Sequence, residues 1–420
     1  MTSYRIPFDV LENFSRDVLI KIGVEPQHAA VVADILTESD RRGHETHGIG
    51  RLKPIYYDRV KKGILETAVK YDIVKETSTT AVIDAHNSLG HPISKIAMQM
   101  AIDKAKQHGL GMVVCRNSTH YGIAGYYTSM AAAQGCVGMC GTNARPSIPP
   151  TGAVENMLGT NPLAFAFPTD EDFDFNLDCA TSIAQRGRIE QYVRENRPVP
   201  AGWVIDDKGQ PCSDAQQVLT GLTKGTHALL PLGGAGEELG GYKGYGYATV
   251  VEVLSASLSQ ANFLRALYGT KPDGSAGPIE LGHFFFAANV EAFTTLEEFK
   301  KSAGDIMREL RTAKKAHPED RIYVAGEKEC EAYHEQIKLG GVIIEPANQK
   351  AIDAMRAEQG LTQYVFPWDA KQDVPITMTE EKPNLKVCKY PEGAVQNMCL
   401  DKSMYVGDGC YHACSCHVRK

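Results

Sequence analysis

The feature that most limits how this chain can fold is a regular alternation of strand and helix patterns near its middle. The alternation runs strand, helix, strand, helix and strand, over residues 79–85, 93–109, 110–115, 122–135 and 136–142. Strand–helix–strand units of this length are typical of a sheet with parallel neighbours and with helices covering its faces. The sequence therefore predicts an α/β fold.

The chain on either side of this block has a different pattern. Apolar residues recur at helical spacing in the N-terminal part, and helical patterns return over 296–361. Between them, alternating strand runs appear at 161–168 and 174–181, and a buried strand is expected at 282–293. A long helix is expected over 245–264.

The composition changes from Thr362, where Pro, Lys, Asp, Glu and Cys accumulate without sustained periodicity. We expect residues 362–420 to form an extension outside the main core. This extension holds residue types that suit zinc at Cys388, Cys399, Cys410, His412, Cys414, Cys416 and His417. Their spacing fits no standard zinc pattern, so we expect free thiols there and no metal site.

Composition and charge favour a soluble enzyme. The 420 residues are 43% apolar, enough for a large core, and the formal net charge of −7 argues against nucleic acid or an anionic membrane as the main partner. No apolar run approaches the roughly 20 residues of a membrane span, and the N-terminus shows no secretory signal pattern. Six of the eleven cysteines are scattered before residue 331, which is typical of free thiols in a reducing compartment. We therefore expect a cytoplasmic location.

The strand-to-helix loops carry no ordinary dinucleotide fingerprint. The nearest candidate, GGAGEELGG at 233–241, misses the Gly-x-Gly-x-x-Gly spacing by one residue and follows no strand of such a unit. The sequence also lacks a Walker loop, a serine nucleophile elbow and a His-Glu-x-x-His motif. An ordinary Rossmann dehydrogenase is therefore excluded by motif, although a nucleotide could bind through other loops.

Two polar stretches are candidates for chemistry, and the first is HETHGIGR at 44–51. A turn entering a helix would put His47 and Arg51 on one side, where the guanidinium can hold a carboxylate by two hydrogen bonds. The same residues suit a helix cap with solvated charges. A metal pair at His44 and His47 has no third ligand nearby in the sequence.

The second stretch, CRNSTHYGIAGYY at 115–127, puts a run of polar residues between a buried strand and a helix. His120 follows the strand end, where α/β folds usually place their chemistry. A neutral imidazole there can exchange a proton with a hydroxyl or a ketone. The alternative is a capping loop whose histidine packs against Tyr126 or Tyr127.

Three further turns give weaker signals, because glycine-rich turns are mostly structural. They are GTNP at 159–162, DCATS at 178–182 and GGYKGYG at 240–246. In the last of these, Lys243 and the backbone amides at a helix start would make a reasonable phosphate cradle.

Taken together, these segments resemble the malate/L-lactate/L-sulfolactate dehydrogenase family, which also includes ureidoglycolate dehydrogenase and cyclic imino-acid reductases. The matching motifs keep the family's order, and the resemblance spans residues 1–361. These motifs are DRRGHETHGIGRL (40–52), RNSTHYGIAGYY (116–127), GTNPLAFAFP (159–168), DCATSIAQRGRIE (178–190), PLGG with GYKGYG (231–246), GHFF (282–285) and VAGE (324–327).

The resemblance implies a mixed α/β fold that binds NAD or NADP without the Rossmann fingerprint. It implies a helical domain, residues 1–76 with 296–361, and a cofactor-binding mixed-sheet domain, residues 77–295. The active site is expected between these two domains, and a homodimer is implied. The extension at 362–420 has no counterpart in the family.

The resemblance also implies roles for individual residues. His120 matches the acid/base histidine beside the cofactor, and His47 and Arg51 match the pair that anchors the substrate. Thr46 and Asn143 are further expected substrate contacts. The remaining expected cofactor contacts are Thr142, Thr160, Asp178, Cys179, Ala180, Lys243, Ala325, Gly326 and Glu327.

The sequence departs from the family pattern at a few positions. Glu45 and Thr46 replace the commoner Asp-Ser between the two histidines, and Ala144 and Arg145 stand where the family often has Ser after Thr-Asn. The insertion-like EELG at 237–240 can lengthen a loop near the cofactor. Because Arg145 can alter which substrates fit, substrate specificity cannot be copied from the family.

We expect an NAD(P)-dependent oxidoreductase that transfers a hydride between nicotinamide and C2 of a small 2-hydroxy or 2-oxo acid, with malate and oxaloacetate as the best candidates. Alternatives on the same scaffold are reduction of a cyclic imine and oxidation of ureidoglycolate. A non-catalytic nucleotide- or metal-binding protein is an alternative of another class. The combination of His47, Arg51 and His120 argues against a nucleotide-binding protein without catalysis.

Overall fold

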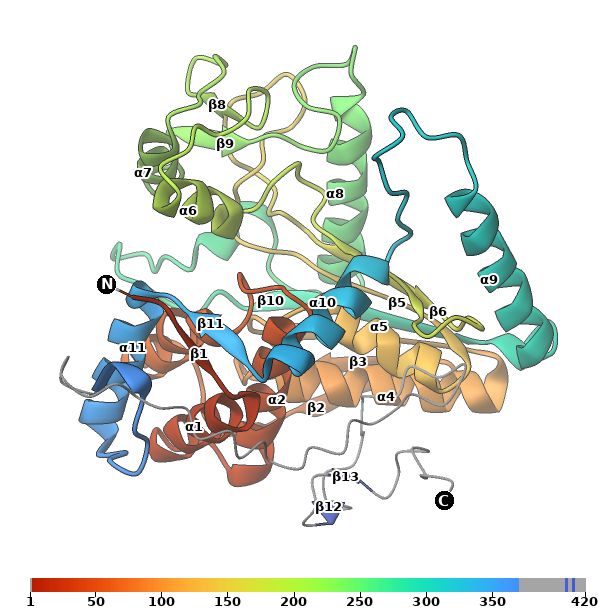
Figure 1. The fold of residues 1–420 in the computed structure, drawn as a ribbon, viewed down its shortest axis with the longest axis horizontal. Coiled ribbons are helices and arrows are strands. Elements are labelled where there is room, and N and C mark those ends of the chain that lie inside the picture. The colour runs from red at the N-terminus through yellow and green to blue at the C-terminus, as the bar shows by residue number, and fades with distance from the viewer. Residues whose placement is uncertain (1, 370–404, 407–409, 412–420) are drawn as a thin grey trace.

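The computed structural model describes residues 2–369, 405–406 and 410–411, and its centre is a mixed seven-stranded sheet (Figure 1). The strand order is β2-β3-β4-β10-β5-β6-β7. The strands are β2 Asp72–Glu76, β3 Thr80–Asp84, β4 Leu110–Ser118, β5 Cys136–Thr142, β6 Leu163–Phe167, β7 Phe175–Cys179 and β10 Leu281–Asn289. This sheet confirms the predicted mixed α/β class.

The long strand β10 explains why the sheet is mixed. The expected parallel neighbours meet directly only at β3 and β4, which are joined through α4, Gly90–His108. β4 and β5 both pair with β10, which runs antiparallel to each of them. The carboxyl ends of β4 and β5 therefore lie at the same edge of the sheet, separated by one strand from far along the chain.

Helices cover both faces of the sheet. α4 and α5, Ala124–Ala133, pack on one face, and α8, Gly241–Ala256, packs on the other (Figure 1). Side chains of β10 alternate between the two faces, as the pleat requires. Phe285 belongs to the core beneath α4 and α5, whereas Phe284 packs with Val251 of α8. The helix α8 ends at Ala256, earlier than the sequence pattern suggested.

A helical region is built from segments that are far apart in the sequence. It contains α1 Phe8–Lys21, α2 Pro26–Arg41, η1 Ile49–Arg51, η2 Leu52–Tyr57, α3 Asp58–Lys61 and α11 Pro346–Gln359, together with the paired strands β1 Tyr4–Ile6 and β11 Val342–Ile344. Phe14, Leu36 and Ile352 share its core. Residues 362–369 also pack here, because Phe366 is 2% exposed. The start of the expected extension thus contributes to this core.

The other elements lie outside these two parts. A small lobe forms around its own core from α6 Arg186–Arg194, α7 Ala215–Lys224, β8 Val204–Asp206 and β9 His227–Leu229. The remaining elements are η3 Leu264–Tyr268, η4 Val290–Ala292, α9 Leu296–Arg311, α10 Glu327–Leu339, η5 Pro367–Asp369, β12 Tyr405–Val406 and β13 Cys410–Tyr411. The division into domains at 76/77 and 295/296 stays a prediction, and β2 belongs to the sheet although it precedes the first of these boundaries.

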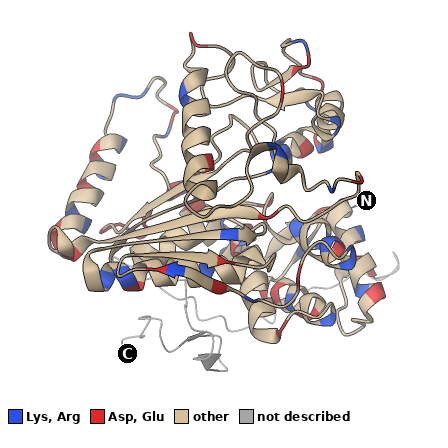
Figure 2. Cartoon of the chain, turned by 180° about the vertical axis from the view of Figure 1, so that it is seen from behind, with Lys and Arg blue, Asp and Glu red and all other residues tan. Residues whose placement is uncertain are grey.

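Charged residues of both signs lie side by side over the helices (Figure 2). No helix among the described residues is long and apolar enough to cross a bilayer. Within the same residues, no group of three or more His, Cys, Asp or Glu side chains is arranged to hold a metal ion. The Cys and His residues considered as zinc ligands in the extension lie outside the described residues, apart from the short strand that includes Cys410.

Candidate active site

His120 lies in the loop between β4 and α5, and its ring meets aromatic side chains from three other segments. The Tyr56 hydroxyl lies 2.5 Å from His120 Nδ1 and 3.2 Å from His91 Nε2. The His47 ring stacks on the His120 ring, with centroids 5.7 Å apart and planes 14° apart. The ring contacts that the structure gives His120 are therefore these three side chains, rather than the Tyr126 or Tyr127 of the capping alternative.

The segment that carries Tyr56 has an unusual winding. Arg51 ends the 3₁₀ helix η1, and the π-helix η2 follows immediately. π-Helical turns are rare and are frequently found at functional sites. Pro54 lies within this turn and has no N–H to donate, which loosens the usual helical hydrogen-bond pattern. The winding buries Tyr56 completely and directs its hydroxyl to His120.

The loop that carries His120 is held against the start of α4. Thr119 Oγ1 donates to Ser88 O at 2.9 Å and accepts from the Gly90 N–H at 3.0 Å. A Cβ atom on Gly90 would lie 2.1 Å from Thr119 O and 2.6 Å from His120 O. Only a glycine therefore allows α4 to approach the His120 loop this closely.

Burial keeps the imidazoles of this cluster neutral. Burial lowers the pKa of His120 well below its usual value, and the nearby His47, His91, Arg51 and Arg59 lower it further. Burial likewise lowers the pKa of His47 and of His91 to about 3 in each case. A neutral imidazole has one free acceptor nitrogen, so His120 can take up a proton at physiological pH. The Tyr56 hydroxyl can donate to His120 Nδ1 or accept from it, so it suits either tautomer.

Thr46, His47 and Arg51 form one connected group beside this cluster. Thr46 Oγ1 lies 2.9 Å from His47 Nδ1 and accepts a hydrogen bond of 3.2 Å from Gln185 Nε2. Arg51 Nε donates to the Thr46 carbonyl, and its Nη2 lies 3.6 Å from Glu190 Oε2. The guanidinium thus has one carboxylate partner of its own and is held in place by the backbone.

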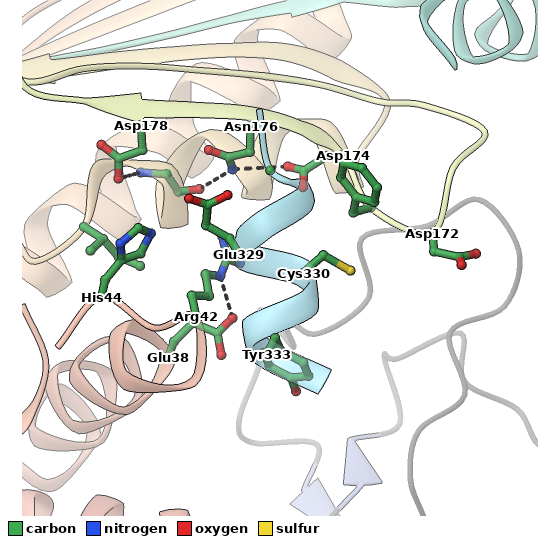
Figure 3. A pocket seen from close by; sticks show the side chains of 14 residues that line it. Glu38, Arg42, His44, Asp172, Asp174, Asn176, Asp178, Glu329, Cys330 and Tyr333 are labelled. Carbon is green, nitrogen blue, oxygen red and sulfur yellow. Dashed lines mark hydrogen bonds and ion pairs between the residues drawn. The ribbon is translucent and has the colours of Figure 1, made fainter. Parts of the chain in front are cut away.

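A hollow of about 640 Å³, part of it open to solvent, begins three residues beyond His120 at Ile123 (Figure 3). Figure 3 shows Asp178 and Asn176 of β7 on one side, with Glu329 and Cys330 of α10 below them. The lining residues are Glu38, Arg42, His44, Ile123, Gly125, Asp172, Phe173, Asp174, Asn176, Asp178, Gly326, Glu329, Cys330 and Tyr333. Most of them are polar, and five are carboxylic acids.

A glycine turn and one hydrogen bond shape the lining of the hollow. Gly326 has a φ of 92° before α10, and a Cβ there would lie 2.7 Å from Asp174 O, so side-chain bulk at this turn is excluded. Asp178 Oδ2 accepts the Gly125 N–H at 2.7 Å, which ties the floor of the hollow to the helix after His120.

Burial also shifts the acids of the hollow. Burial raises the pKa of Asp178, although its hydrogen bond from Gly125 partly offsets this. Burial raises the pKa of Asp174 in the same way, against the nearby charge of Arg42 and the hydrogen bond from Ser129. These carboxyls therefore hold their protons to higher pH than exposed ones do.

The structure gathers only part of the predicted cofactor set around the hollow. Asp178 and Gly326 line it, and the Ala325 carbonyl accepts from the Asn176 N–H at 3.3 Å beside it. Cys179 and Ala180 continue β7 from Asp178 and are partly buried.

Three other predicted cofactor residues do not line the hollow. Lys243 is exposed near the start of α8. Thr160 precedes β6, and its carbonyl accepts the Thr181 N–H at 2.9 Å. The carboxylate of Glu327 accepts from Arg311 at 3.0 Å and from Arg321 at 2.8 Å, so it is already paired within the protein.

Asn143 and Thr142, at the end of β5, bond to other parts of the protein. Asn143 is fully buried, donates to Asn262 O at 2.9 Å and accepts the Gly282 N–H at 2.9 Å. Thr142 Oγ1 lies 2.7 Å from His283 Nδ1. These bonds tie β5 to β10, and neither residue is among those that line the hollow. The expected contacts of Asn143 with the substrate and of Thr142 with the cofactor stay predictions.

Sequence reasoning missed several residues that the fold brings to the site. Tyr56 and His91 join His120, Arg59 approaches it, and Arg42 and Glu329 line the hollow. His91 lies in the first turn of α4, seven residues after β3 ends, and the sequence gave no signal that it would meet His120. The others had no sequence signal either, because each lies within a helix or just beyond its end and depends on which helix faces the site.

Comparisons with known proteins point to one family. Residues 6–353 match the family model described as malate/L-lactate dehydrogenase. The malate dehydrogenase of Pyrococcus horikoshii is 42% identical over 337 residues, covering 80% of this chain and 90% of that protein. The L-sulfolactate dehydrogenase of Methanocaldococcus jannaschii is 39% identical over 316 residues, covering 74% and 86%. The crystal structure of malate dehydrogenase from Entamoeba histolytica superimposes with a TM-score of 0.83 at 44% identity, covering 87% of this chain and all of that one.

Proposed function

This chain belongs to the malate/L-lactate dehydrogenase family, and from that premise we propose that it interconverts malate and oxaloacetate. As a member of the family it is a dehydrogenase that acts on the CH–OH group of a hydroxy acid with a nicotinamide cofactor. The observation that carries the proposal is the buried contact of 2.5 Å between Tyr56 and His120 beside His47 and Arg51. It puts a neutral base and a carboxylate anchor at one point.

Each residue of this cluster has one task in the proposed reaction. Arg51 pairs with the C1 carboxylate, and His47 helps to hold the substrate oxygen. His120 takes the hydroxyl proton during oxidation and returns it to the ketone during reduction. Tyr56 accepts a hydrogen bond from Nδ1 of the protonated ring and stabilises it. General base action of this kind contributes about 10²–10⁴-fold, and fixed orientation contributes further. Asp178 and Gly326 line the hollow that would hold the nicotinamide cofactor, which would supply the hydride chemistry at C2.

The hollow beside Asp178 is the proposed cofactor site, and its charge favours NAD over NADP. Five acids line it, and Arg42 is already paired with Glu38 at 2.8 Å. A 2′-phosphate would bring two further negative charges towards Asp172, Asp174 and Glu329, whereas a 2′-hydroxyl would not.

A homodimer is part of the proposal. The resemblance to the family implies it, and an exposed apolar face on α8 supports it. Tyr247, Val250 and Val253 are spaced three residues apart and are all exposed, so they share one side of the helix. Sedimentation velocity on the wild type and on Val250→Glu tests this, since a monomeric wild type would contradict it.

The cytoplasmic location expected from the sequence stays a prediction. Its support is that the six cysteines before residue 331 are free thiols, namely Cys115, Cys136, Cys140, Cys179, Cys212 and Cys330. Fractionation of the source cells, followed by detection with an antibody, tests it.

Other reactions on the same scaffold are reduction of a cyclic imine and oxidation of ureidoglycolate. Steady-state assays separate them when oxaloacetate, pyruvate, a cyclic imine and ureidoglycolate are compared with NAD and NADP cofactors in parallel. The proposal expects the highest kcat/KM with oxaloacetate and NADH. A higher kcat/KM with the imine or with ureidoglycolate would show that this compound, and not malate, is the preferred substrate. If none of the compounds is turned over, a binding protein without catalysis is favoured.

A further inference from the structure

Two arginines, Arg51 and Arg59, lie near His120, and a third, Arg145, lies near Arg59. Two of the three, Arg59 and Arg145, have no acidic partner. The positive charges of Arg51 and Arg59 both lower the pKa of His120, and the charge of Arg145 lowers the pKa of Arg59. Arg51 is paired with Glu190. Among the described residues, neither Arg59 nor Arg145 makes a side-chain hydrogen bond or ion pair.

Arg59 is directed to the reaction centre by the helix that carries it. It follows Tyr56 by three residues, so the two side chains lie on the same side of the helical turn. The Tyr56 hydroxyl is at 2.5 Å from His120, which places the start of the Arg59 side chain beside the same cluster. Arg59 is half-buried, and burial lowers its pKa, with the neighbouring charge of Arg145 lowering it further.

Arg145 reaches the same edge of the sheet from a different strand. β4 ends just before His120, and β5 ends three residues before Arg145. Both strands pair with β10, so their carboxyl ends meet at one edge. The Arg145 guanidinium carbon lies 5.8 Å from the centre of the Tyr268 ring, and the Ala144 N–H donates to Asn161 Oδ1 at 3.1 Å. Arg145 is therefore anchored at its base while its charged end remains exposed.

Most of the other arginines among the described residues have acidic partners, whereas Arg5 and Arg188 bond to glutamines instead. Arg41 pairs with Glu12 at 3.2 Å, Arg42 with Glu38 at 2.8 Å, and Arg311 with Glu171 at 3.1 Å. Two neighbouring guanidiniums without such a partner repel one another, and the half-buried one also loses hydration. A ligand that brings a negative group between them removes both costs.

We propose that Arg59 and Arg145 form a second anion-binding subsite, which takes the distal acidic group of a dianionic 2-hydroxy acid while Arg51 holds its C1 carboxylate. This inference rests on the proposed function and adds to it the class of substrate. A dicarboxylate, or an acid with a distal sulfonate, fills both subsites. A monocarboxylate such as lactate leaves the second subsite without an anion. Arg59 has no counterpart among the residues that the sequence singled out.

The test compares kcat/KM for oxaloacetate and for pyruvate in the full-length wild type, Arg59→Met and Arg145→Met. Loss of a hydrogen bond to a charged group lowers kcat/KM by about 10- to 150-fold. We expect a loss of this size for oxaloacetate in each of the two methionine variants. The value for pyruvate should change less than about threefold, because pyruvate has no distal acid. Arg59→Lys keeps the charge and should recover part of the loss.

Lys61→Met is the matched control. It removes a positive charge from the same short helix, but Lys61 is exposed and is already paired with Glu358 at 2.6 Å. Its kcat/KM for both substrates should match the wild type. Equal losses on oxaloacetate and pyruvate in Arg59→Met and Arg145→Met, or no loss on either, would overturn the subsite.

A binding measurement keeps the subsite testable without catalysis. Malonate carries two carboxylates and acetate one, so malonate should raise the melting temperature of the wild type more than acetate does at equal ionic strength. This difference should disappear in Arg145→Met, whose exposed side chain can be removed without disturbing the core. If no 2-oxo acid is turned over, the proposed function fails, whereas equal stabilisation by malonate and acetate overturns the subsite.

Discussion

Two neighbouring regions of this molecule carry opposite charge. The cluster around His120 has Arg51 and Arg59 near it, with Arg145 next to Arg59, whereas the hollow beyond Ile123 is lined by five acids. Figure 3 shows these acids. The net charge of −7 for the whole chain does not predict that basic and acidic residues gather in separate regions. The difference supports the proposal that an anionic substrate and the cofactor bind in separate regions of opposite charge.

Both regions also suppress their own charges by burial. In the first, burial lowers the pKa of the His47 and His120 imidazoles. In the second, burial raises the pKa of the Asp174 and Asp178 carboxyls. Each shift favours the uncharged form, which is the general effect of removing water. The consequence differs, because a neutral imidazole can accept a proton whereas a neutral carboxyl can donate a hydrogen bond.

The largest expected effect comes from a change in the cluster around His120. His120→Ala should lower kcat by at least about 10²-fold, because it removes the proposed general base. Binding of NADH, followed by its fluorescence, should be retained because the hollow is untouched. Near-normal turnover in this variant would show that His120 is not the general base. The cluster around His120 would then not be the place where the proton is transferred.

The next effect concerns the substrate anchor. Arg51→Lys should raise KM for oxaloacetate by about 10-fold or more, since an ammonium cannot make the paired contact with a carboxylate. Arg186→Lys is a matched control, because Arg186 is exposed and pairs with the same Glu190 at 3.1 Å. An unchanged KM for Arg51→Lys in steady-state assays would contradict the anchoring role.

A smaller effect is expected from a change in the hollow that is lined by acids. Asp172→Asn removes one exposed charge from the hollow and should tighten NADPH binding by about fivefold, the value of one unit charge at short range in water. The KM for oxaloacetate should stay the same. Asp207→Asn, an exposed acid that does not line the hollow, serves as the control. Titration of both variants with NADPH measures the effect, and equal affinities would argue against the charge-based preference for NAD.

The smallest effect is a near absence of pH dependence. Because its pKa is lowered, His120 stays neutral as the pH falls from 7 to 6, so kcat/KM for malate oxidation should fall less than about twofold. A histidine with the ordinary pKa of 6.5 would lose about threefold over this range as it becomes protonated. A pH profile of kcat/KM decides between them. A fall of about threefold, with an apparent pKa near 6.5, would show that the free imidazole is not held neutral.

Much of the fold followed from patterns that neighbouring residues create along the chain. The alternation over 79–142 predicted the strands β3, β4 and β5 and the two helices between them, and all are present. It did not predict that β10 would separate β4 from β5. Strand order depends on which strands, far apart in the sequence, pair along their edges. The periodicity of one strand carries no information about which strand it will pair with.

The candidate site shows the same division. His47, Arg51 and His120 stand at turns and strand ends, where local sequence already points to chemistry. Tyr56 and Arg59 belong to a helical segment whose orientation is set by packing in the helical region, so only the folded chain brings them to His120. The resemblance to the family put Asn143 at the substrate, and only the folded chain shows that its side chain is buried and hydrogen-bonded to Asn262 and Gly282.

The sequence by itself determined the α/β class, the absence of a Rossmann loop, and the motifs that carry the resemblance to one dehydrogenase family. Only the tertiary structure decided the strand order, the contact between Tyr56 and His120, and the sorting of basic and acidic groups into two neighbouring regions. Local patterns follow from the backbone geometry of consecutive residues. Burial, pKa and charge clustering follow from contacts between distant segments, which exist only once the chain has folded.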